Sequence, residues 1–308
     1  MDTAKNKLKQ ATSSESPFAA GFKVPITHQD PPGKQGDLPI EPINTQVPTE
    51  DGGLQEYKAA GKLQDKKALI TGGDSGIGRA IALLYAMEGA DSMIAYLPEE
   101  EEDAQETKRQ VEKFGRTCHL ISTDLREFEN CKRVADAALE KLGRVNILVN
   151  NAAFQMVQQD ITDIANDQWI KTFDTNIHPF FYLSKLLIPH MKRGDTIINC
   201  ASINAYIGRP DLLDYTSTKG AIVSFTRGLA NQQMSKGIRV NAVCPGPVWT
   251  PLIPSTMGSS AQDQFTSPMG RPAQPSEIAT CFVFLASADS SMISGQSLHP
   301  NGGVIVNG

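Results

Sequence analysis

A tyrosine and a lysine lie four residues apart in the segment DYTSTKGAIVSFTRGLA (214–230), which has a helical pattern. Side chains at this spacing project from one face of a helix, so the ammonium of Lys219 can stand beside the phenol of Tyr215. A phenol has a pKa of about 10 and is a poor acid or base at neutral pH, but a neighbouring positive charge favours the phenolate. The pair predicts that Tyr215 is a general acid/base and that Lys219 lowers its pKa.

A serine lies thirteen residues before this tyrosine, at the end of the apolar run TIINCA (196–201). If the run is a strand of an open α/β sheet, Ser202 lies at the carboxyl edge, where such sheets bind ligands. There its hydroxyl can donate a hydrogen bond to the oxygen of a reacting carbonyl. No G-x-S-x-G turn surrounds Ser202, so the sequence does not support a serine hydrolase.

A glycine-rich loop follows the apolar run KALIT (67–71) and leads into a helical pattern. Glycines there permit a tight turn, and the N–H groups and dipole of the helix attract a phosphate. A Tyr/Lys pair or a glycine loop is a weak signal by itself, and a Tyr/Lys pair is more often a solvated helix face. Together and in this order they predict a dinucleotide site. The expected loop residues are Gly72, Asp74, Ser75, Gly76, Ile77 and Gly78.

Short β-branched runs alternate with longer helical patterns from residue 65 onward. Helical patterns such as 78–89, 104–115 and 131–143 end in glycine. This alternation predicts one Rossmann-type α/β domain over residues 65–308, a doubly wound parallel sheet of about seven strands with helices on both faces. The expected strands lie at 67–71, 93–97, 118–122, 145–150, 196–201, 238–243 and 296–299.

Residues 1–64 have a different composition, in which prolines and glycines interrupt any periodic pattern. Composition alone leaves two interpretations of this extension, a disordered tail or an ordered arm packed on a neighbouring subunit.

Composition also excludes several classes of protein. The net charge of −5 is spread over mixed-sign segments, which argues against a nucleic-acid partner. The five cysteines show neither disulfide nor metal spacing, so no metal site is expected. No apolar run approaches the roughly 20 residues of a membrane helix, and the first residues lack a secretory signal. We expect a cytoplasmic protein without membrane contact.

The spacing TGxxxGIG, read at Thr71 to Gly78, resembles the fingerprint of the short-chain dehydrogenase/reductase family. The resemblance covers residues 65–308, because later landmarks appear in order, including NNAA at 150–153 and YxxxK at 215–219. The chain looks most similar to a subgroup with a long N-terminal extension, described as glucose/ribitol dehydrogenase homologues or general stress oxidoreductases. The resemblance implies a homo-oligomer, which we expect to be a tetramer.

The resemblance also assigns roles to particular residues. Asn176 would hold a water that links Lys219 to solvent, and would count with Ser202, Tyr215 and Lys219 as catalytic. Asp124 would accept a hydrogen bond from the adenine amine. The other residues implied to contact the cofactor, besides the loop, Tyr215 and Lys219, are Leu125, Asn151, Ala152, Pro245, Gly246, Val248 and Thr250.

The cofactor preference depends on the end of the second strand, where NAD-selective members carry an acidic residue that bonds the ribose hydroxyls. The stretch reads AYLPEE (95–100), with Tyr96 in that region and glutamates in the expected first turn of the next helix. The loop GGDSG offers no cation for a 2′-phosphate, and Arg79 is the nearest guanidinium. We therefore expect a slight preference for NADP(H), with NAD(H) possible.

A substrate pocket is expected from residues that follow the strand ends and the Pro-Gly turn, with residues 247–272 as a mobile lid. Its apolar lining favours a medium-sized carbonyl over a bare sugar. The expected lining residues are Gln155, Met156, Ile203, Tyr206, Trp249, Leu252 and Ile253.

The sequence thus predicts an NAD(P)(H)-dependent oxidoreductase that interconverts a small to medium carbonyl and its alcohol. Two alternatives stay open because the fold does not decide function. One is a reductase or isomerase of specialised metabolism acting on an imine or a complex ketone. The other is a catalytically silent nucleotide sensor.

Overall fold

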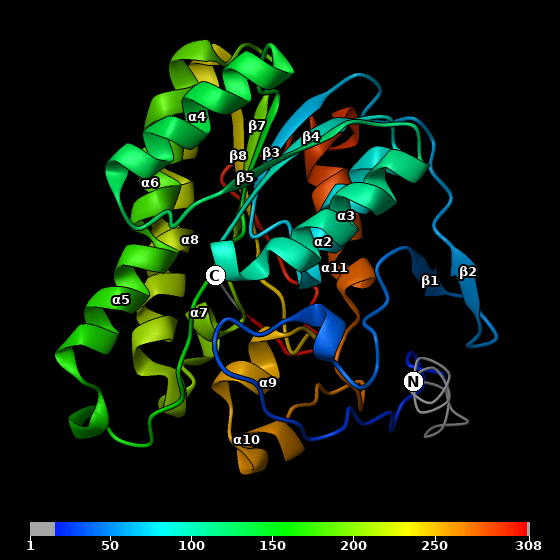
Figure 1. The fold of residues 1–308 in the computed structure, drawn as a ribbon, viewed down its shortest axis with the longest axis vertical. Coiled ribbons are helices and arrows are strands. Elements are labelled where there is room, and N and C mark those ends of the chain that lie inside the picture. The colour runs from blue at the N-terminus through cyan, green and yellow to red at the C-terminus, as the bar shows by residue number, and fades with distance from the viewer. Residues whose placement is uncertain (1–15, 307–308) are drawn as a thin grey trace.

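The protein contains a seven-stranded parallel sheet, and the computed structural model describes residues 16–306 (Figure 1). The strand order is β5-β4-β3-β6-β7-β8-β9, and every neighbouring pair is parallel. This confirms the predicted doubly wound α/β fold. The strands are β3 (Lys67–Thr71), β4 (Asp91–Tyr96), β5 (Cys118–Ser122), β6 (Ile147–Asn150), β7 (Thr196–Cys200), β8 (Arg239–Val243) and β9 (Ser297–Leu298).

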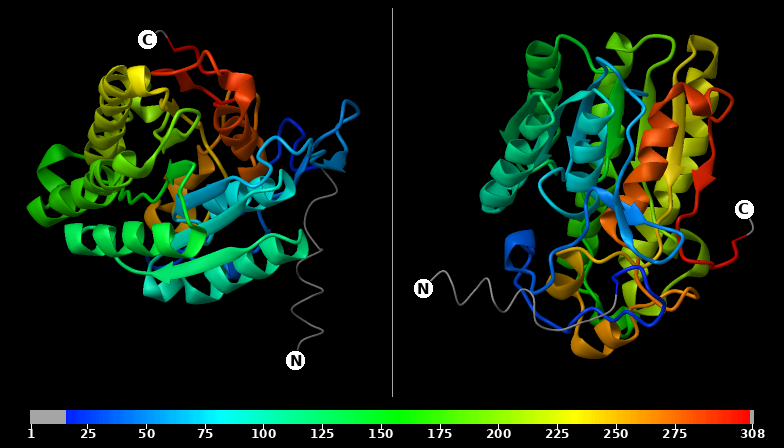
Figure 2. Two further views of the ribbon diagram at one scale, coloured as in Figure 1. Left: turned by 90° about the horizontal axis from the view of Figure 1, so that it is seen from above. Right: turned by 90° about the vertical axis from the view of Figure 1, so that its right-hand side faces the viewer.

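Helices cover both faces of this sheet (Figure 2). One layer contains α2 (Gly76–Met87), α3 (Glu101–Lys113) and α11 (Pro275–Ala286). The other contains α4 (Phe128–Leu142), α5 (Asn166–Asn176), α6 (His178–Leu187) and α8 (Leu213–Gln233). Three short helices, α7 (Asn204–Ile207), α9 (Leu252–Thr256) and α10 (Ser259–Asp263), lie beyond the carboxyl ends of the strands.

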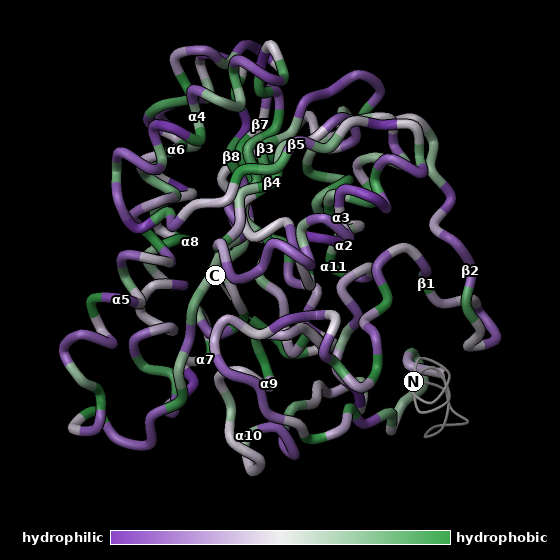
Figure 3. Tube along the Cα trace, in the orientation of Figure 1, coloured by the Kyte–Doolittle hydropathy of each residue, from purple (hydrophilic) through white to green (hydrophobic). Residues whose placement is uncertain are grey.

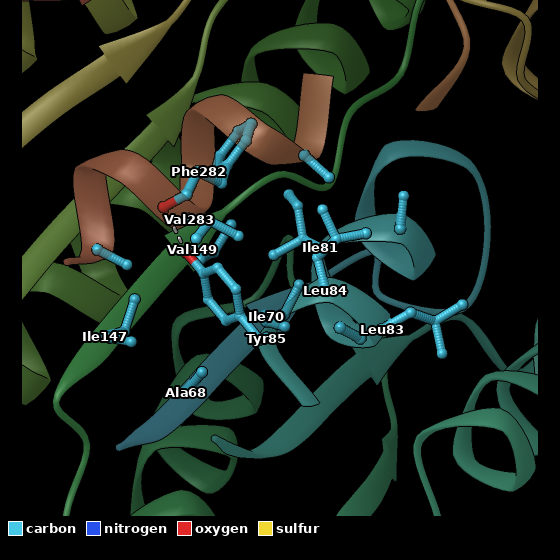
Figure 4. Close-up of a cluster of buried hydrophobic side chains, with 14 of the residues drawn as sticks. Ala68, Ile70, Ile81, Leu83, Leu84, Tyr85, Ile147, Val149, Phe282 and Val283 are labelled. Carbon is cyan, nitrogen blue, oxygen red and sulfur yellow. Dashed lines mark hydrogen bonds between the residues drawn. The ribbon is translucent and has the colours of Figure 1, made fainter. Parts of the chain in front are cut away.

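Alternate residues of the central strands pack into two separate hydrophobic cores, one on each face of the sheet. Both faces of a strand are therefore buried, which explains why the strand sequences are continuous apolar runs. Ile70 packs with Leu84 and Phe282 on the face covered by α2 and α11 (Figure 4). Leu69, the next residue back along β3, belongs to the core beneath α4 and α6. The central strands are accordingly hydrophobic along the trace (Figure 3).

The strand order reverses at β3, which pairs with β4 on one side and with β6 on the other. Helix α2, which follows β3, and helix α5, which follows β6, lie on opposite faces of the sheet. A crevice therefore forms between them at the carboxyl ends of the strands. Ligands of open α/β sheets bind at this kind of reversal.

The described part of the N-terminal extension, residues 16–64, packs on the body of its own chain. It contains a short antiparallel hairpin, β1 (Gln46–Pro48) and β2 (Leu54–Glu56), and buries Phe18, Phe22 and Leu38. This packing on its own chain differs from the disordered tail that composition also allowed. Residues 1–15 of the extension lie outside the described residues.

Within residues 16–306, no helix combines the length and the hydropathy needed to cross a membrane. The five cysteines are free thiols, and four of them are buried.

Candidate active site

A cavity of about 590 Å³ lies beyond the carboxyl ends of the strands and collects most of the residues expected from the sequence. Its lining includes residues that follow β3, β4, β6, β7 and β8. The expected residues that line it are Gly72, Asp74, Ser75, Gly76, Ile77, Tyr96, Asp124, Leu125, Asn151, Ala152, Gln155, Ser202, Ile203, Tyr215, Lys219, Pro245, Gly246, Val248, Thr250, Leu252 and Ile253.

The three residues expected to carry the chemistry meet at this cavity although they come from different elements. Ser202 follows β7, while Tyr215 and Lys219 lie in the first half of α8. Ser202 and Tyr215 both line the cavity, and the Ser202 hydroxyl accepts from the backbone N–H of Asn204 at 3.1 Å. The ammonium of Lys219 stands 5.2 Å from the centroid of the Tyr215 ring and donates to the carbonyl oxygen of Cys200, 2.8 Å away. All three side chains are buried.

Burial dominates the protonation of this pair. It raises the pKa of Tyr215 above the ordinary value for a phenol, and the hydrogen bond with Ser202 opposes this rise. Burial also lowers the pKa of Lys219. The pKa of Tyr215 is thus raised and not lowered as the sequence led us to expect, because desolvation of the buried phenol is the largest influence on it.

The glycine loop has the shape that a phosphate group needs. Gly76 has φ +50°, a conformation that L side chains rarely adopt, and a Cβ at Gly78 would lie 1.8 Å from the carbonyl oxygen of Gly72. Helix α2 can therefore pack directly on the loop. The backbone N–H of Ile77 has no acceptor among the described residues and lies at the positive end of α2. These features fit the pyrophosphate of a dinucleotide.

Asn151 connects this loop to the strand beside it. Its side chain donates to the carbonyl oxygens of Thr71 and Gly72, at 3.0 and 3.1 Å. The hydroxyl of Thr71 in turn accepts from the backbone N–H groups of Asn151 and Ala152. Thr71, the first residue of the TGxxxGIG motif, thus holds the ends of β3 and β6 together. This contact fixes the glycine loop at the edge of the crevice.

The β4 end of the cavity is acidic. Burial raises the pKa of Asp74 to about 6 and that of Glu100 to about 8, and Glu99 also lines this end. Arg79, the nearest guanidinium in the sequence, is buried and pairs with Asp103 at 3.1 Å. It also donates to the carbonyl oxygen of Asp74. Arg79 is therefore committed to the interior and does not line the cavity.

Asp124 lines the cavity after β5 and forms an ion pair with Arg126. Burial opposes ionisation, but the hydrogen bonds from Arg126 prevail and hold the pKa of Asp124 below its usual value. Asp124 is therefore an anionic acceptor at neutral pH, as a contact with an adenine amine requires.

Asn176 does not line the cavity but supports a residue that does. It is fully buried at the end of α5, where its side chain accepts from the backbone N–H of Phe154 at 2.7 Å and donates to the carbonyl oxygen of Phe154 at 2.8 Å. It also donates to the hydroxyl of Thr218, next to Lys219. The side chain therefore links the loop after β6 to α8.

Three residues expected in the substrate pocket do not line the cavity. Trp249 is fully buried, and its indole N–H donates to the carbonyl oxygen of Ile40 in the N-terminal extension. Tyr206 turns toward β9, where its hydroxyl bonds to Ser297. Met156 also lies outside the lining, and its carbonyl oxygen accepts from Gln168. These residues were expected in the pocket because they follow strand ends or the Pro-Gly turn. Such a position does not determine the direction in which a side chain points.

Several residues of the lining were not expected from the sequence. Phe154 directly follows the NNAA run, so its position relative to β6 was the available signal. Met257 and Phe265 lie within the expected lid, where the direction of a side chain has no sequence signature. Pro31, Pro32 and Gly33 of the N-terminal extension also line the cavity, and no pattern in the sequence indicated this.

The class of protein is defined by three features together. They are the parallel sheet with this strand order, the glycine loop where the order reverses, and the group of Ser202, Tyr215 and Lys219 beside the loop. A family model described as enoyl-(acyl carrier protein) reductase matches residues 72–305. The chain belongs to the short-chain dehydrogenase/reductase family and is an NAD(P)-dependent oxidoreductase acting on CH–OH and C=O groups.

Similar proteins come from bacteria and plants. General stress protein 39 of Bacillus subtilis is 52% identical over 82% of this chain and 88% of its own length. Glucose and ribitol dehydrogenase of Daucus carota is 49% identical over 91% and 98%. NADPH-dependent aldehyde reductase 1, chloroplastic, of Arabidopsis thaliana is 49% identical over 82% and 90%. The match with the described subgroup is thereby confirmed.

Solved structures agree on the fold. A short chain dehydrogenase from Burkholderia cenocepacia in complex with NADP has a TM-score of 0.74 at 29% identity, covering 79% of this chain and 98% of that one. A 3-ketoacyl-(acyl-carrier-protein) reductase from Brucella melitensis complexed with NADH has a TM-score of 0.72 at 32% identity, covering 78% and 98%.

Proposed function

We propose that the chain reversibly transfers a hydride between the nicotinamide of NAD(P)(H) and a small to medium aldehyde, ketone or polyol, with Tyr215 as the general acid/base. The observation that carries this proposal is that Ser202, Tyr215 and Lys219 line the same cavity as the glycine loop. The ammonium of Lys219 lies 5.2 Å from the centroid of the Tyr215 ring.

In the reducing direction, the bound nicotinamide supplies the hydride that reaches the carbonyl carbon. The hydroxyl of Tyr215 gives its proton to the carbonyl oxygen, and the hydroxyl of Ser202 donates a hydrogen bond to the same oxygen. Lys219 stays bonded to the Cys200 carbonyl and places its positive charge near the phenolate that remains. Asn176 is proposed to act through structure, since it links the loop at Phe154 to α8.

The lid side of the cavity supports a moderately hydrophobic substrate. Ile203, Ile253, Met257 and Phe265 line it, together with polar residues that include Gln155, Ser255 and Thr256. Apolar walls select substrates by shape and burial, and polar groups among them fix the orientation. The printed names of two relatives, a glucose and ribitol dehydrogenase and an aldehyde reductase, agree with carbonyl or polyol chemistry. We favour a medium-sized carbonyl compound over a bare sugar as the substrate. We also propose that residues 247–272 form the lid of the substrate pocket.

The acidic β4 end changes the expected cofactor preference. The sequence favoured NADP(H) slightly, because no acidic residue was evident at the end of the second strand. In the structure, Asp74, Glu99 and Glu100 line this end of the cavity. Like charges disfavour that phosphate. We propose that NAD(H) binds more tightly than NADP(H).

A cofactor-oxidation screen tests the proposed function. The full chain, tested with NADH and NADPH against aldehydes, ketones, sugars and imines, should turn over aldehydes or ketones. Nucleotide binding with no turnover on any carbonyl would contradict the oxidoreductase and favour the nucleotide sensor. Turnover of imines alone would favour the specialised reductase.

We further propose that the chain forms a homotetramer and works in the cytoplasm. Large apolar side chains are exposed on two neighbouring helices, Trp169 and Ile170 on α5 and Phe181 on α6, which supports a subunit interface. Five free thiols agree with a reducing compartment. Light scattering that finds a monomer at micromolar concentration would contradict the tetramer.

A further inference from the structure

The N-terminal extension supplies part of the cavity wall. Residues 27–43, here called the strap, contain three residues of the lining, namely Pro31, Pro32 and Gly33. These three lie in a turn that the side chain of Gln29 closes. That side chain accepts from the backbone N–H of Lys34 at 2.6 Å and donates to the carbonyl oxygen of Lys34 at 3.1 Å. The turn therefore has a defined shape at the cavity.

The turn rests on the lid, next to α9 and α10 (Figure 1). The backbone N–H of Gln29 donates to the carbonyl oxygen of Pro254, 3.1 Å away. Thr27 exchanges two hydrogen bonds with the side chain of Gln262, at 3.2 and 2.8 Å. The contact is closest at Gly33, which is buried, because an added Cβ there would lie 2.4 Å from the carbonyl oxygen of Pro251. Only a glycine lets the strap approach the lid this closely.

The other end of the strap is fixed to the body of the domain. The backbone N–H of Gln35 donates to the side chain of Asp103 at 2.6 Å, and the side chain of Gln35 accepts from the backbone N–H of Gly76 at 2.7 Å. All three residues are buried. Further along, the backbone N–H of Ile43 donates to the side chain of Gln274 at 3.0 Å. The strap is thus held firmly where it leaves the cavity.

The two ends of the strap differ in their access to water. Thr27 and Gln29, which bond to the lid, are partly exposed, whereas Gln35 and Asp103 on the body are buried. Hydrogen bonds that water can reach open more easily than buried ones, because water replaces the lost partner. The contacts between strap and lid are therefore the ones expected to break first.

We propose that the strap is a latch, which is fixed to the body and holds the lid closed over a bound dinucleotide. Release of the nucleotide then requires the contacts of the turn with α9 and α10 to break. This inference rests on the proposed function, which includes residues 247–272 as a lid. It assigns the extension a part in the release step, which sets the turnover rate of many enzymes with lids.

Stopped-flow displacement of NADH from the full-length chain by excess NAD⁺ tests the latch. In the Gly33→Ala variant the new methyl group forces the turn away from Pro251, so we expect NADH to dissociate about tenfold faster than from the wild type. Gly36→Ala is the matched control in the same strap, since its added Cβ would lie 3.7 Å from Asp103, an ordinary contact. Its dissociation rate should stay within about twofold of the wild type.

Hydrogen exchange of the wild-type chain, with and without NADH, gives a second measurement that needs no variant. Peptides covering residues 27–34 and 252–264 should both exchange more slowly when NADH is bound, because the latch and the lid close together. Slower exchange in the lid peptides alone would overturn the inference. So would NADH dissociation from Gly33→Ala within twofold of the wild type, or equal acceleration in both glycine variants.

The failure of the proposed function would look different. A wild-type chain that binds neither NADH nor NADPH would refute the proposed function, and the latch would fall with it. A chain that binds NADH and shows the expected effect of Gly33→Ala, but reduces no carbonyl compound, would refute the oxidoreductase and keep the latch.

Discussion

Lys219 directs its ammonium to the carbonyl oxygen of Cys200, at 2.8 Å, and not to the phenol of Tyr215. The bond ties the first half of α8 to the end of β7, the strand that Ser202 follows. The same lysine therefore supplies charge near the phenol and holds the helix against the strand, so Tyr215 and Ser202 stay together. The spacing of four residues places the pair on one face, but the sheet decides what the ammonium bonds.

Replacing Tyr215 with Phe should abolish turnover and leave nucleotide affinity near normal, because the change removes the proton donor and keeps the ring. Steady-state rates with NADH and an aldehyde, together with NAD⁺ titration, measure the two effects. Tyr182→Phe on α6, which is absent from the cavity lining, is the control. A Tyr215→Phe variant as active as the wild type would refute the assigned role.

Ser202→Ala should lower turnover about a hundredfold, because the carbonyl oxygen loses a donor. The serine also opposes the rise in the pKa of Tyr215, so its removal should raise that pKa further. Alcohol oxidation requires the phenolate, and its rate should therefore begin to rise at a higher pH than in the wild type. A pH–rate profile measures this shift. An unchanged profile would show that Ser202 does not influence the phenol.

Above pH 8, where Glu100 is ionised, Glu100→Gln should improve NADP⁺ affinity about fivefold relative to NAD⁺, since it removes a charge near the expected position of the 2′-phosphate. Glu102→Gln on α3, outside the cavity lining, is the matched control and should have no effect. Titrations of both nucleotides with each variant give the ratio. Equal ratios in the wild type and the Glu100→Gln variant would contradict the proposed role of the acidic end.

The preference for NAD⁺ in the wild-type chain should also depend on pH. The raised pKa values mean that Asp74 and Glu100 take up protons as the pH falls through about 6 and about 8. Both are ionised above these values, so discrimination should be greatest at high pH and weaken toward low pH. Binding of the two nucleotides measured across this range tests the direction. Stronger discrimination at low pH would contradict it.

Gly78→Ala should destabilise the protein and remove nucleotide binding, because the new methyl group would lie 1.8 Å from the Gly72 carbonyl oxygen. Gly220→Ala on α8 is the control, since no heavy atom lies within 4 Å of its added Cβ. A helical glycine replaced by alanine there should stabilise the protein by up to about 1 kcal/mol. Denaturant unfolding distinguishes the two. Equal stability of both variants would contradict the packing described at the loop.

The sheet, the glycine loop and the meeting of Ser202, Tyr215 and Lys219 at one cavity could be predicted because each depends on local pattern. Apolar runs such as KALIT identified buried strands, and Tyr215 and Lys219 share a helix, so their relation follows from helical geometry. Ser202 and the loop residues follow strand ends, and parallel strands bring their carboxyl ends to one edge.

The tertiary structure alone decided the rest, namely the course of the extension, the direction of Trp249 and the protonation of the site. Trp249 reaches Ile40 and Gln35 reaches Gly76 across long separations in sequence, through irregular segments that carry no periodic signal. The pKa of Tyr215 depends on how much water the fold removes from the phenol. Local patterns encode which face of an element is buried, whereas contacts between distant segments and desolvation arise only when the whole chain has packed.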